Sequence, residues 1–180
     1  MIEKRLSVGI IDLNINNLFS IYKSCIEAGY KTEIISLKKN SFNYDIVILP
    51  GVGAFKSGMD FLKKNHIDKK IYNYLEKSSS LVYGICLGMQ LLFKSSNEFT
   101  KTNGLNLING NVGKFTSSKQ IRVPHVGWNK IKIIDKNYKK IFKKFENEYF
   151  YFIHSYYGSP KKKNNIFGIT RYGDLDFCSM

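Results

Sequence analysis

The sequence predicts an α/β fold in which a doubly wound, mostly parallel sheet carries helices on both faces and antiparallel strands at an edge. Two observations lead to this prediction. In the first half of the chain, apolar strand-like runs alternate with helix-like segments over short links, as in βαβ units with buried parallel strands. The second half contains short β-prone pieces punctuated by glycines, a pattern typical of antiparallel strands.

The first βαβ unit is predicted within residues 7–37. Residues 7–12 (SVGIID) form a short apolar run, as expected for a strand buried on both faces. Residues 14–17 then offer polar capping side chains, and residues 32–37 (TEIISL) predict the second strand. Between them lies one helical face that ends at Gly29, formed by Leu18, Ile21, Cys25 and Ala28.

The same alternation continues to residue 96. Residues 45–49 (DIVIL) predict a third strand, stopped by a proline, and residues 81–85 (LVYGI) predict a fourth. Residues 87–96 (LGMQLLFKSS) predict a helix directly after the fourth strand. A helical face between the third and fourth strands is formed by Ile67, Ile71, Tyr74 and Leu75.

The second half is predicted to be mostly β. Residues 122–134 show an alternation of apolar and polar residues around Pro124. Residues 148–157 (EYFYFIHSYY) and 165–172 are aromatic or β-prone. No linker, repeat or low-complexity segment interrupts the chain. Residues 1–180 are therefore predicted to form a single domain.

Composition excludes several classes of function. The 180 residues are 43% hydrophobic, yet no apolar run approaches the roughly 20 residues that span a bilayer, so no membrane segment is expected. Lys+Arg 28 against Asp+Glu 14 gives a net charge of +14, but no nucleic-acid-binding motif accompanies it. We interpret this charge as a solvated surface. Three widely spaced cysteines without a C-x-x-C pair favour a cytoplasmic protein over a disulfide framework or a metal site.

Cys86 is the strongest catalytic candidate. It lies between a predicted strand and a predicted helix in residues 84–88 (GICLG), a G-x-C-x-G pattern. Glycines on both sides are what a sharp strand-to-helix turn requires, and the serine version of this turn carries the nucleophile of α/β-hydrolases. A thiol at a helix N-terminus is expected to gain from the helix dipole, which favours the thiolate. The alternative is a structural cysteine in the core, which is the interpretation of Cys25.

A second candidate is the loop at residues 50–55 (PGVGAF), which follows the third strand. Glycines at the carboxyl end of a strand let the backbone approach a ligand and turn N–H groups toward it. In a parallel sheet this loop can lie beside the turn that carries Cys86. We therefore expect it to form an oxyanion cradle, the alternative being an ordinary βα turn.

A thiol nucleophile needs a base, and the sequence offers three histidines. His66 lies in a lysine-rich helical segment and is most simply a solvated side chain. His125 lies in residues 124–129 (PHVGWN) with the only tryptophan, either in a ligand or interaction loop or packed within a loop. His154 ends an aromatic strand and faces either a site or an edge of the core. The residues alone do not choose among the three.

At these segments the chain resembles the class I, triad-type glutamine amidotransferases, and in particular the glutaminase subunits that serve imidazole glycerol phosphate synthesis. The resemblance spans nearly the whole chain in the order of the family, and residues 12–20 (DLNINNLFS) match more loosely. It also implies the fold of that family. The four matching segments are residues 49–55 (LPGVGAF), 84–93 (GICLGMQLLF), 122–129 (RVPHVGWN) and 151–157 (YFIHSYY).

The resemblance implies the chemistry of the site. Cys86 would attack the carboxamide of glutamine and release ammonia through a thioester, with no cofactor and no metal. The oxyanion donors would be the Leu87 N–H and an N–H of the loop at Gly51 and Val52. Residues that would hold the glutamine are Gln90, Glu98, Ser155 and Tyr156.

The resemblance also implies a partner. The surface around Pro124, His125 and Trp128 and the loop at residues 51–55 would face a (β/α)8-barrel cyclase subunit in a heterodimer. Ammonia would pass into that barrel without meeting bulk water, for histidine biosynthesis. Two alternatives stay open at this point. The ammonia could serve amino-sugar synthesis for surface polysaccharide or flagellin modification, or the chain could be a catalytically inactive binding or scaffold subunit.

One departure from the family concerns the triad. In the family, the base and its carboxylate lie in a histidine-proline-glutamate motif on a strand after the segment that matches residues 168–177, whereas this sequence ends at Met180. We therefore expect the chain to lack the last strand and helix of the family. Loss of triad partners costs on the order of 10³–10⁶-fold in rate, so glutaminase turnover is expected to be low.

Overall fold

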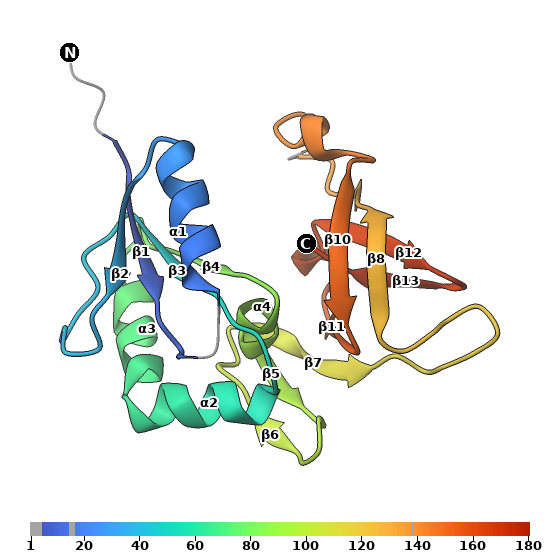
Figure 1. Cartoon of the computed structure of the whole chain (residues 1–180), viewed down its shortest axis with the longest axis horizontal. Helices are drawn as coiled ribbons and strands as arrows, with labels where there is room; N and C mark the ends of the chain where they lie inside the picture. The colour runs from blue at the N-terminus through green and yellow to red at the C-terminus, as the bar shows by residue number, and fades with distance from the viewer. Residues whose placement is uncertain (1–4, 15–16, 138) are drawn as a thin grey trace. The chain divides into compact units, whose positions relative to one another are not determined.

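The computed structural model describes residues 5–14, 17–137 and 139–180. The chain divides into two compact units, Met1–Leu92 and Phe93–Met180, and Figure 1 shows the elements of each. We describe each unit by itself, and that the two form a single domain stays a prediction. Within the described residues, no helix is both long enough and apolar enough to cross a bilayer.

The first unit is built on a parallel sheet. Its four strands lie in the order β2-β1-β3-β4, and every neighbouring pair is parallel. The strands are β1 (Ser7–Ile11), β2 (Lys31–Ile35), β3 (Ile46–Leu49) and β4 (Leu81–Gly84). The helices are α1 (Leu18–Glu27), α2 (Phe55–Lys64), α3 (Ile67–Leu75) and α4 (Leu87–Leu91). The predicted α/β fold with a parallel sheet is confirmed.

Apolar side chains alternate between the two faces of this sheet. Val8, Ile10 and Ile48 are buried, and Leu18, Ile21, Tyr22 and Cys25 of α1 pack against them. Val47 and Leu49 point to the opposite face because successive strand residues alternate, and both are fully buried. Cys25 is therefore a packing residue, as predicted.

Helix α1 begins and ends as its sequence predicts. The Asn17 side chain accepts a hydrogen bond from the Ser20 N–H at 3.4 Å, which satisfies a free donor of the first turn. At the other end Gly29 has a φ of 88°, and the Gly29 and Tyr30 N–H groups bond to carbonyls of the last turn at 2.9 and 3.0 Å. Of the other predicted capping candidates, residues 15–16 lie outside the described residues.

Helix α2 was missed by the sequence analysis, which found only the helical face of α3. The signal was present, because Phe55, Met59 and Leu62 recur at helical spacing and all three are buried. His66, with a φ of 54°, separates the two helices.

The predicted helix over residues 87–96 is wrong after Leu91. Residues Phe93–Ser96 form strand β5, which pairs in parallel with β7 (Ile108–Lys114). Phe93 and Ser96 are buried while Lys94 is exposed, so strand pairing in the second unit overrides the helical pattern.

The second unit is mostly antiparallel, as predicted for this half of the sequence. The prediction that these strands extend an edge of the parallel sheet is wrong, because the described strands of this unit form sheets of their own. Its strands pair with one another in three sheets, ordered β11-β7-β5-β6, β10-β8 and β13-β12-β9. The remaining strands are β6 (Thr102–Asn103), β8 (His125–Lys130), β9 (Lys132–Ile133), β10 (Tyr149–His154), β11 (Tyr156–Pro160), β12 (Gly168–Tyr172) and β13 (Leu175–Cys178), with short 3-10 helices at Lys143–Phe145 and Lys163–Asn165.

An aromatic cluster forms a core of the second unit. Phe115, Ile121 and Phe177 are buried, and Phe152, Tyr157 and Tyr172 are among the half-buried residues that pack against them. The Phe115 ring lies 5.3 Å from the Phe177 ring and 4.6 Å from the Tyr157 ring, centroid to centroid. Aromatic residues from five strands or strand ends thus meet at one place.

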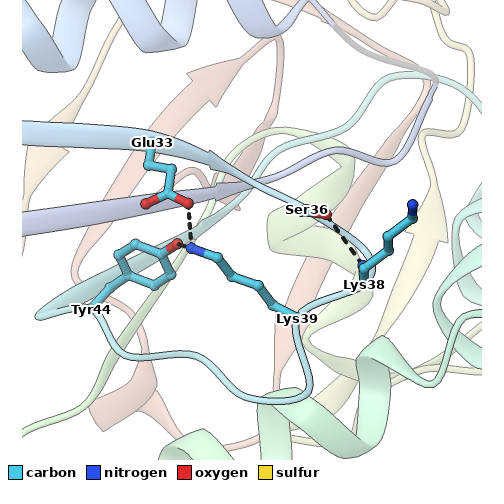
Figure 2. A network of polar contacts seen from close by, with 5 residues as sticks. All are labelled: Glu33, Ser36, Lys38, Lys39 and Tyr44. Carbon is cyan, nitrogen blue, oxygen red and sulfur yellow. Dashed lines mark hydrogen bonds and ion pairs between the residues drawn. The ribbon is translucent and has the colours of Figure 1, made fainter.

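A polar network joins the edge strand β2 to the segment that follows it (Figure 2). The Lys39 ammonium donates to the Glu33 carboxylate and to the Tyr44 hydroxyl, the latter at 2.8 Å. Nearby, the Ser36 hydroxyl oxygen accepts from the Lys38 N–H at 3.4 Å. These residues lie at the surface of the first unit.

Candidate active site

Cys86 occupies a sharp turn between strand β4 and helix α4. The strand ends at Gly84 and the helix begins at Leu87, so two residues make the connection. Cys86 has φ 55° and ψ −115°, a backbone conformation that non-glycine residues rarely adopt. Strain of this kind persists only where the surrounding structure enforces it, and it is concentrated at functional sites.

The two glycines of the G-x-C-x-G pattern are required by close backbone approaches. A Cβ on Gly88 would lie 1.7 Å from the Leu49 carbonyl oxygen, and a Cβ on Gly84 would lie 2.6 Å from the Met89 Cα. No side chain fits at either position. The end of β3, the end of β4 and the start of α4 are therefore packed backbone against backbone around Cys86.

The loop after β3 lies beside this turn, as predicted. The Ile85 N–H donates to the Leu49 carbonyl at 3.0 Å, and the Leu87 N–H donates to the Gly51 carbonyl at 3.3 Å. In this arrangement the Leu87 N–H, a predicted oxyanion donor, is engaged by a loop carbonyl. The predicted oxyanion hole of Gly51, Val52 and Leu87 thus has its parts adjacent, but a carbonyl oxygen bonds to one of its donors.

The sequence-based expectation that Cys86 is a thiolate is not supported. Surrounding protein excludes water from part of the thiol's environment and raises the pKa of Cys86, and the Leu87 backbone N–H opposes this to a smaller extent. Helix α4 has only five residues, so its dipole is weak. Cys86 nevertheless keeps exposed surface, so the sulfur is accessible to a substrate.

Four further residues were predicted to bind glutamine. Gln90 lies on α4 in the same unit as Cys86, and its N–H donates to the Cys86 carbonyl at 3.2 Å. Glu98, Ser155 and Tyr156 belong to the second unit, where the Glu98 N–H bonds to the Ser96 hydroxyl at 3.1 Å. The structure thus brings Gln90 together with Cys86, and it describes the other three in the second unit alone.

The three histidines differ in environment. His66 is exposed between α2 and α3, as expected for a solvated side chain. His125 and His154 bond to each other in the second unit, with His125 Nδ1 and His154 Nε2 separated by 2.9 Å. His125 is only 3% exposed, so it offers no surface to a partner. The predicted partner surface therefore keeps Pro124 and Trp128, which are exposed, and loses His125.

The sequence analysis found one residue of a larger exposed apolar face. On strands β8 and β10, alternate residues point outward and remain exposed, and Trp128 is 68% exposed. The signal was the unbroken run of aromatic and aliphatic residues at 149–153 (YFYFI), because side chains of a strand alternate between its two faces and one face of such a run must be apolar and outward. We call this set the β8–β10 face, and its members are Val126, Trp128, Tyr149, Tyr151 and Ile153.

In the part of the chain that the structure describes, no three histidine, cysteine, aspartate or glutamate side chains come together as a metal site would need.

A parallel sheet with a strained cysteine turn beside a glycine loop is the arrangement that the resemblance to glutamine amidotransferases implies. Residues 9–178 match the family described as "Glutamine amidotransferase class-I", and the chain belongs to this family. Among solved structures, a glutamine amidotransferase superposes with a TM-score of 0.69 at 14% identity, covering 94% of this chain and 86% of that one. That likeness concerns the fold.

Within the family, the chain is similar to subunits of imidazole glycerol phosphate synthase. The HisH subunit of that synthase from Caldanaerobacter subterraneus subsp. tengcongensis is 41% identical over 167 residues, which cover 92% of this chain and 80% of the relative. The HisH subunit from Chlorobaculum tepidum is 36% identical over 176 residues, covering 96% and 84%.

Proposed function

We propose that this chain is the glutamine-hydrolysing subunit of an imidazole glycerol phosphate synthase, acting in the cytoplasm in histidine biosynthesis. The observation that carries the proposal is the strained Cys86 turn with the Gly51 loop hydrogen-bonded to it. The similarity to HisH subunits favours the histidine pathway over amino-sugar synthesis.

The chemistry follows from the Cys86 sulfur. As a thiolate it attacks the carboxamide carbon of glutamine, the amide oxygen takes up the negative charge, and the nitrogen leaves as ammonia once it has been protonated. Water then hydrolyses the thioester to glutamate. Because the pKa of the Cys86 thiol is raised, the thiol needs a base to lose its proton at neutral pH.

The oxyanion needs backbone donors at the same place. In the structure the Gly51 carbonyl accepts the Leu87 N–H at 3.3 Å. A carbonyl oxygen beside a developing oxyanion would repel it. We propose that this bond breaks when glutamine is processed, so that the Leu87 N–H and the Val52 N–H both face the oxyanion. Gln90, Glu98, Ser155 and Tyr156 would hold the glutamine.

The proposed partner is a (β/α)8-barrel cyclase that uses the ammonia and forms a heterodimer with this chain. The β8–β10 face supports a protein interface, since a contiguous exposed apolar patch marks an interaction surface. Trp128 and Tyr151 are paired across the two strands, with ring centroids 5.6 Å apart. Pro124, also exposed, directly precedes β8.

Labelling with a glutamine analogue tests the catalytic assignment. The diazoketone 6-diazo-5-oxo-L-norleucine presents an electrophilic carbon where the carboxamide of glutamine would lie. We expect it to alkylate Cys86 alone among the three cysteines, and we expect glutamine to protect. The rate should still rise with pH beyond 9, because the pKa of Cys86 is raised above 9.0. Equal labelling of Cys25 and Cys86, or no protection by glutamine, would refute the assignment.

A binding measurement tests the partner assignment. Replacing Trp128 by serine should weaken binding to the purified cyclase by at least 10-fold, because large aromatic side chains dominate interface energies. Phe19→Ser is the matched control, since Phe19 is an equally exposed aromatic residue on α1. Equal affinities of the two variants would exclude the β8–β10 face as the docking surface.

A further inference from the structure

The second unit holds a histidine pair that the proposed chemistry does not use, in which His125 is buried and His154 is half-buried. His125 is the first residue of β8, and His154 is the last residue of β10. The two stand opposite each other in the antiparallel register, and their rings bond at 2.9 Å. Of the residues that the structure describes, His125 is one of only three buried polar or charged ones.

The protonation of the pair follows from its second partner. His154 Nδ1 lies 2.9 Å from the Tyr156 carbonyl oxygen, and a carbonyl can only accept. His154 Nδ1 therefore carries a hydrogen and donates it. In a neutral His154 ring Nε2 is then the acceptor, so His125 must donate from Nδ1. The pair forms a directed chain from His125 through His154 to the Tyr156 carbonyl.

The surroundings keep both rings neutral. The Tyr172 and Phe152 rings both stack on the His125 ring, with centroids 3.9 and 5.0 Å from it. Phe115 and Phe177 pack against both histidines. The phenol groups of this cluster belong to Tyr157 of β11 and Tyr172 of β12. The Tyr172 hydroxyl bonds to the Arg122 backbone at 2.7 and 3.2 Å.

No carboxylate is among the described contacts of the pair. Burial lowers the pKa of both histidines, and the neighbouring His154 lowers that of His125 further, to about 4. A proton added to either ring would leave an uncompensated charge among aromatic rings.

The chain of bonds ends at the corner between β10 and β11. Ser155 and Tyr156 form this corner, and the Phe115 N–H holds it from the other side by donating to the Ser155 carbonyl at 3.0 Å. Hydrogen bonds therefore hold the corner at two places. One joins it to the residue after β7, and the others join it through the two histidines to β8. Strand β8 also carries Trp128 of the β8–β10 face.

We propose that His125 and His154 are positioning residues, which fix the Ser155–Tyr156 corner to strand β8 so that the corner can hold the glutamine. This proposal rests on the proposed function, because only there do Ser155 and Tyr156 contact substrate. Because the proposed chemistry gives the pair no role in a bond-making step, we expect the pair to act on substrate binding and to leave the reactivity of the Cys86 sulfur unchanged.

Nuclear magnetic resonance of the full chain with 15N-labelled histidine tests the pair directly. At pH 7 we expect both rings to be neutral and to carry their hydrogen on Nδ1. A ring that carries its hydrogen on Nε2 alone, or a charged ring at this pH, would overturn the proposal, because the directed chain to Tyr156 could not form.

Variants test the positioning role. His125→Phe keeps a ring in the cluster but removes the donor, and His125→Asn keeps a donor near the place of Nδ1. Tyr172→Phe is the matched control, since it keeps the stacked ring and loses only the hydroxyl. For alkylation of Cys86 by 6-diazo-5-oxo-L-norleucine, we expect His125→Phe to raise the half-saturating concentration at least 10-fold with an unchanged maximal rate. His125→Asn should restore it to within about threefold of wild type, and Tyr172→Phe should match wild type.

The outcomes separate this proposal from the proposed function. Unchanged half-saturation in His125→Phe, or equal losses in all three variants, would overturn the positioning role. If the wild-type chain shows no glutamine-protected labelling, the proposed function fails instead. Hydrogen exchange of backbone amides then tests whether the histidine pair holds the Ser155–Tyr156 corner. Exchange of the Phe115 N–H should be at least 10-fold faster in His125→Phe than in Tyr172→Phe, and equal exchange would overturn the tie between the pair and the corner.

Discussion

The Cys86 turn in the first unit and the histidine pair in the second unit hold reactive side chains by different means. At the turn, backbone groups from β3, β4 and α4 approach so closely that Gly84 and Gly88 have no room for a Cβ. At the pair, aromatic side chains from several strands enclose two polar rings. We therefore expect an added atom to be the change that most disturbs the folding of the turn. For the cluster, we expect the largest loss of stability from removing a ring or adding a charge.

The largest expected effect is that of Gly88→Ala. The new Cβ would lie 1.7 Å from the Leu49 carbonyl oxygen, so strand β3 and helix α4 must separate. Backbone cannot give way as a flexible side chain can, and the loop at Gly51 would lose its place beside Cys86. We expect no glutamine-protected labelling of Cys86 and a strongly lowered midpoint of thermal unfolding.

Gly113→Ala is the matched control for this substitution. A Cβ on Gly113 in strand β7 meets no atom within 4 Å. Its midpoint of unfolding should stay within a few degrees of wild type. If Gly113→Ala lowered the midpoint of unfolding as much as Gly88→Ala does, the close backbone packing around Gly88 would not be the cause of the loss.

The next largest effect is expected for Phe115→Ala, which removes a ring from the cluster. Phe115 is buried and contacts both histidines, Tyr157 and Phe177. Truncation of a buried phenylalanine costs roughly 3–5 kcal/mol in the free energy of unfolding. Chemical denaturation measures this loss. Phe99→Ala serves as control because Phe99 is 83% exposed, and an equal loss there would contradict the role of the cluster.

An added charge should destabilise the cluster through His125. Its pKa is 6.5 in the unfolded chain and about 4 in the folded one, so the unfolded state takes up a proton first as the pH falls. The contribution of His125 to the free energy of unfolding is complete above pH 6.5 and is lost as the pH falls toward 4. The expected loss is roughly 3 kcal/mol.

Denaturation of wild type and His125→Phe at pH 7 and pH 4.5 isolates this contribution, because carboxylates titrate alike in both proteins. We expect the stability of wild type to fall further than that of the variant. Parallel losses would mean that protonation of His125 does not oppose folding.

Local chemistry explains how much of the fold could be predicted from sequence. The capping Asn17 and the αL Gly29 act through neighbours in the chain, so helix α1 was predictable. The Cys86 turn was predictable because the G-x-C-x-G pattern marks a sharp strand-to-helix turn, although the close approach of Leu49 to Gly88 was not visible in the sequence. Strand β5 was not, because Phe93 and Ser96 resemble a continuing helix until β7 pairs with them. Only contacts distant in sequence decide such a segment.

The histidine pair was unpredictable for the same reason. His125 and His154 are 29 residues apart, and their bond depends on the register of β8 with β10. From the sequence, His125 could lie in an interaction loop or be packed within a loop, and His154 could face a site or an edge of the core. In the structure both rings pack against Phe115 of the aromatic cluster. The Gly51 carbonyl on the Leu87 N–H was equally hidden, since a glycine loop permits either orientation of its peptide groups.

The smallest effect is expected at the surface of the first unit, where Lys39 joins Glu33 and Tyr44 (Figure 2). The Lys39 and Glu33 side chains are 42% and 50% exposed, so water and salt screen their attraction, and the entropy lost in ordering two long side chains offsets much of the remainder. Lys39→Gln should therefore leave the midpoint of thermal unfolding unchanged at both low and high salt, and Cys86 labelling should equal that of wild type. A midpoint that falls at low salt and recovers at high salt would instead show that this network holds the edge strand β2, and that charge as well as backbone packing supports the unit containing the Cys86 turn.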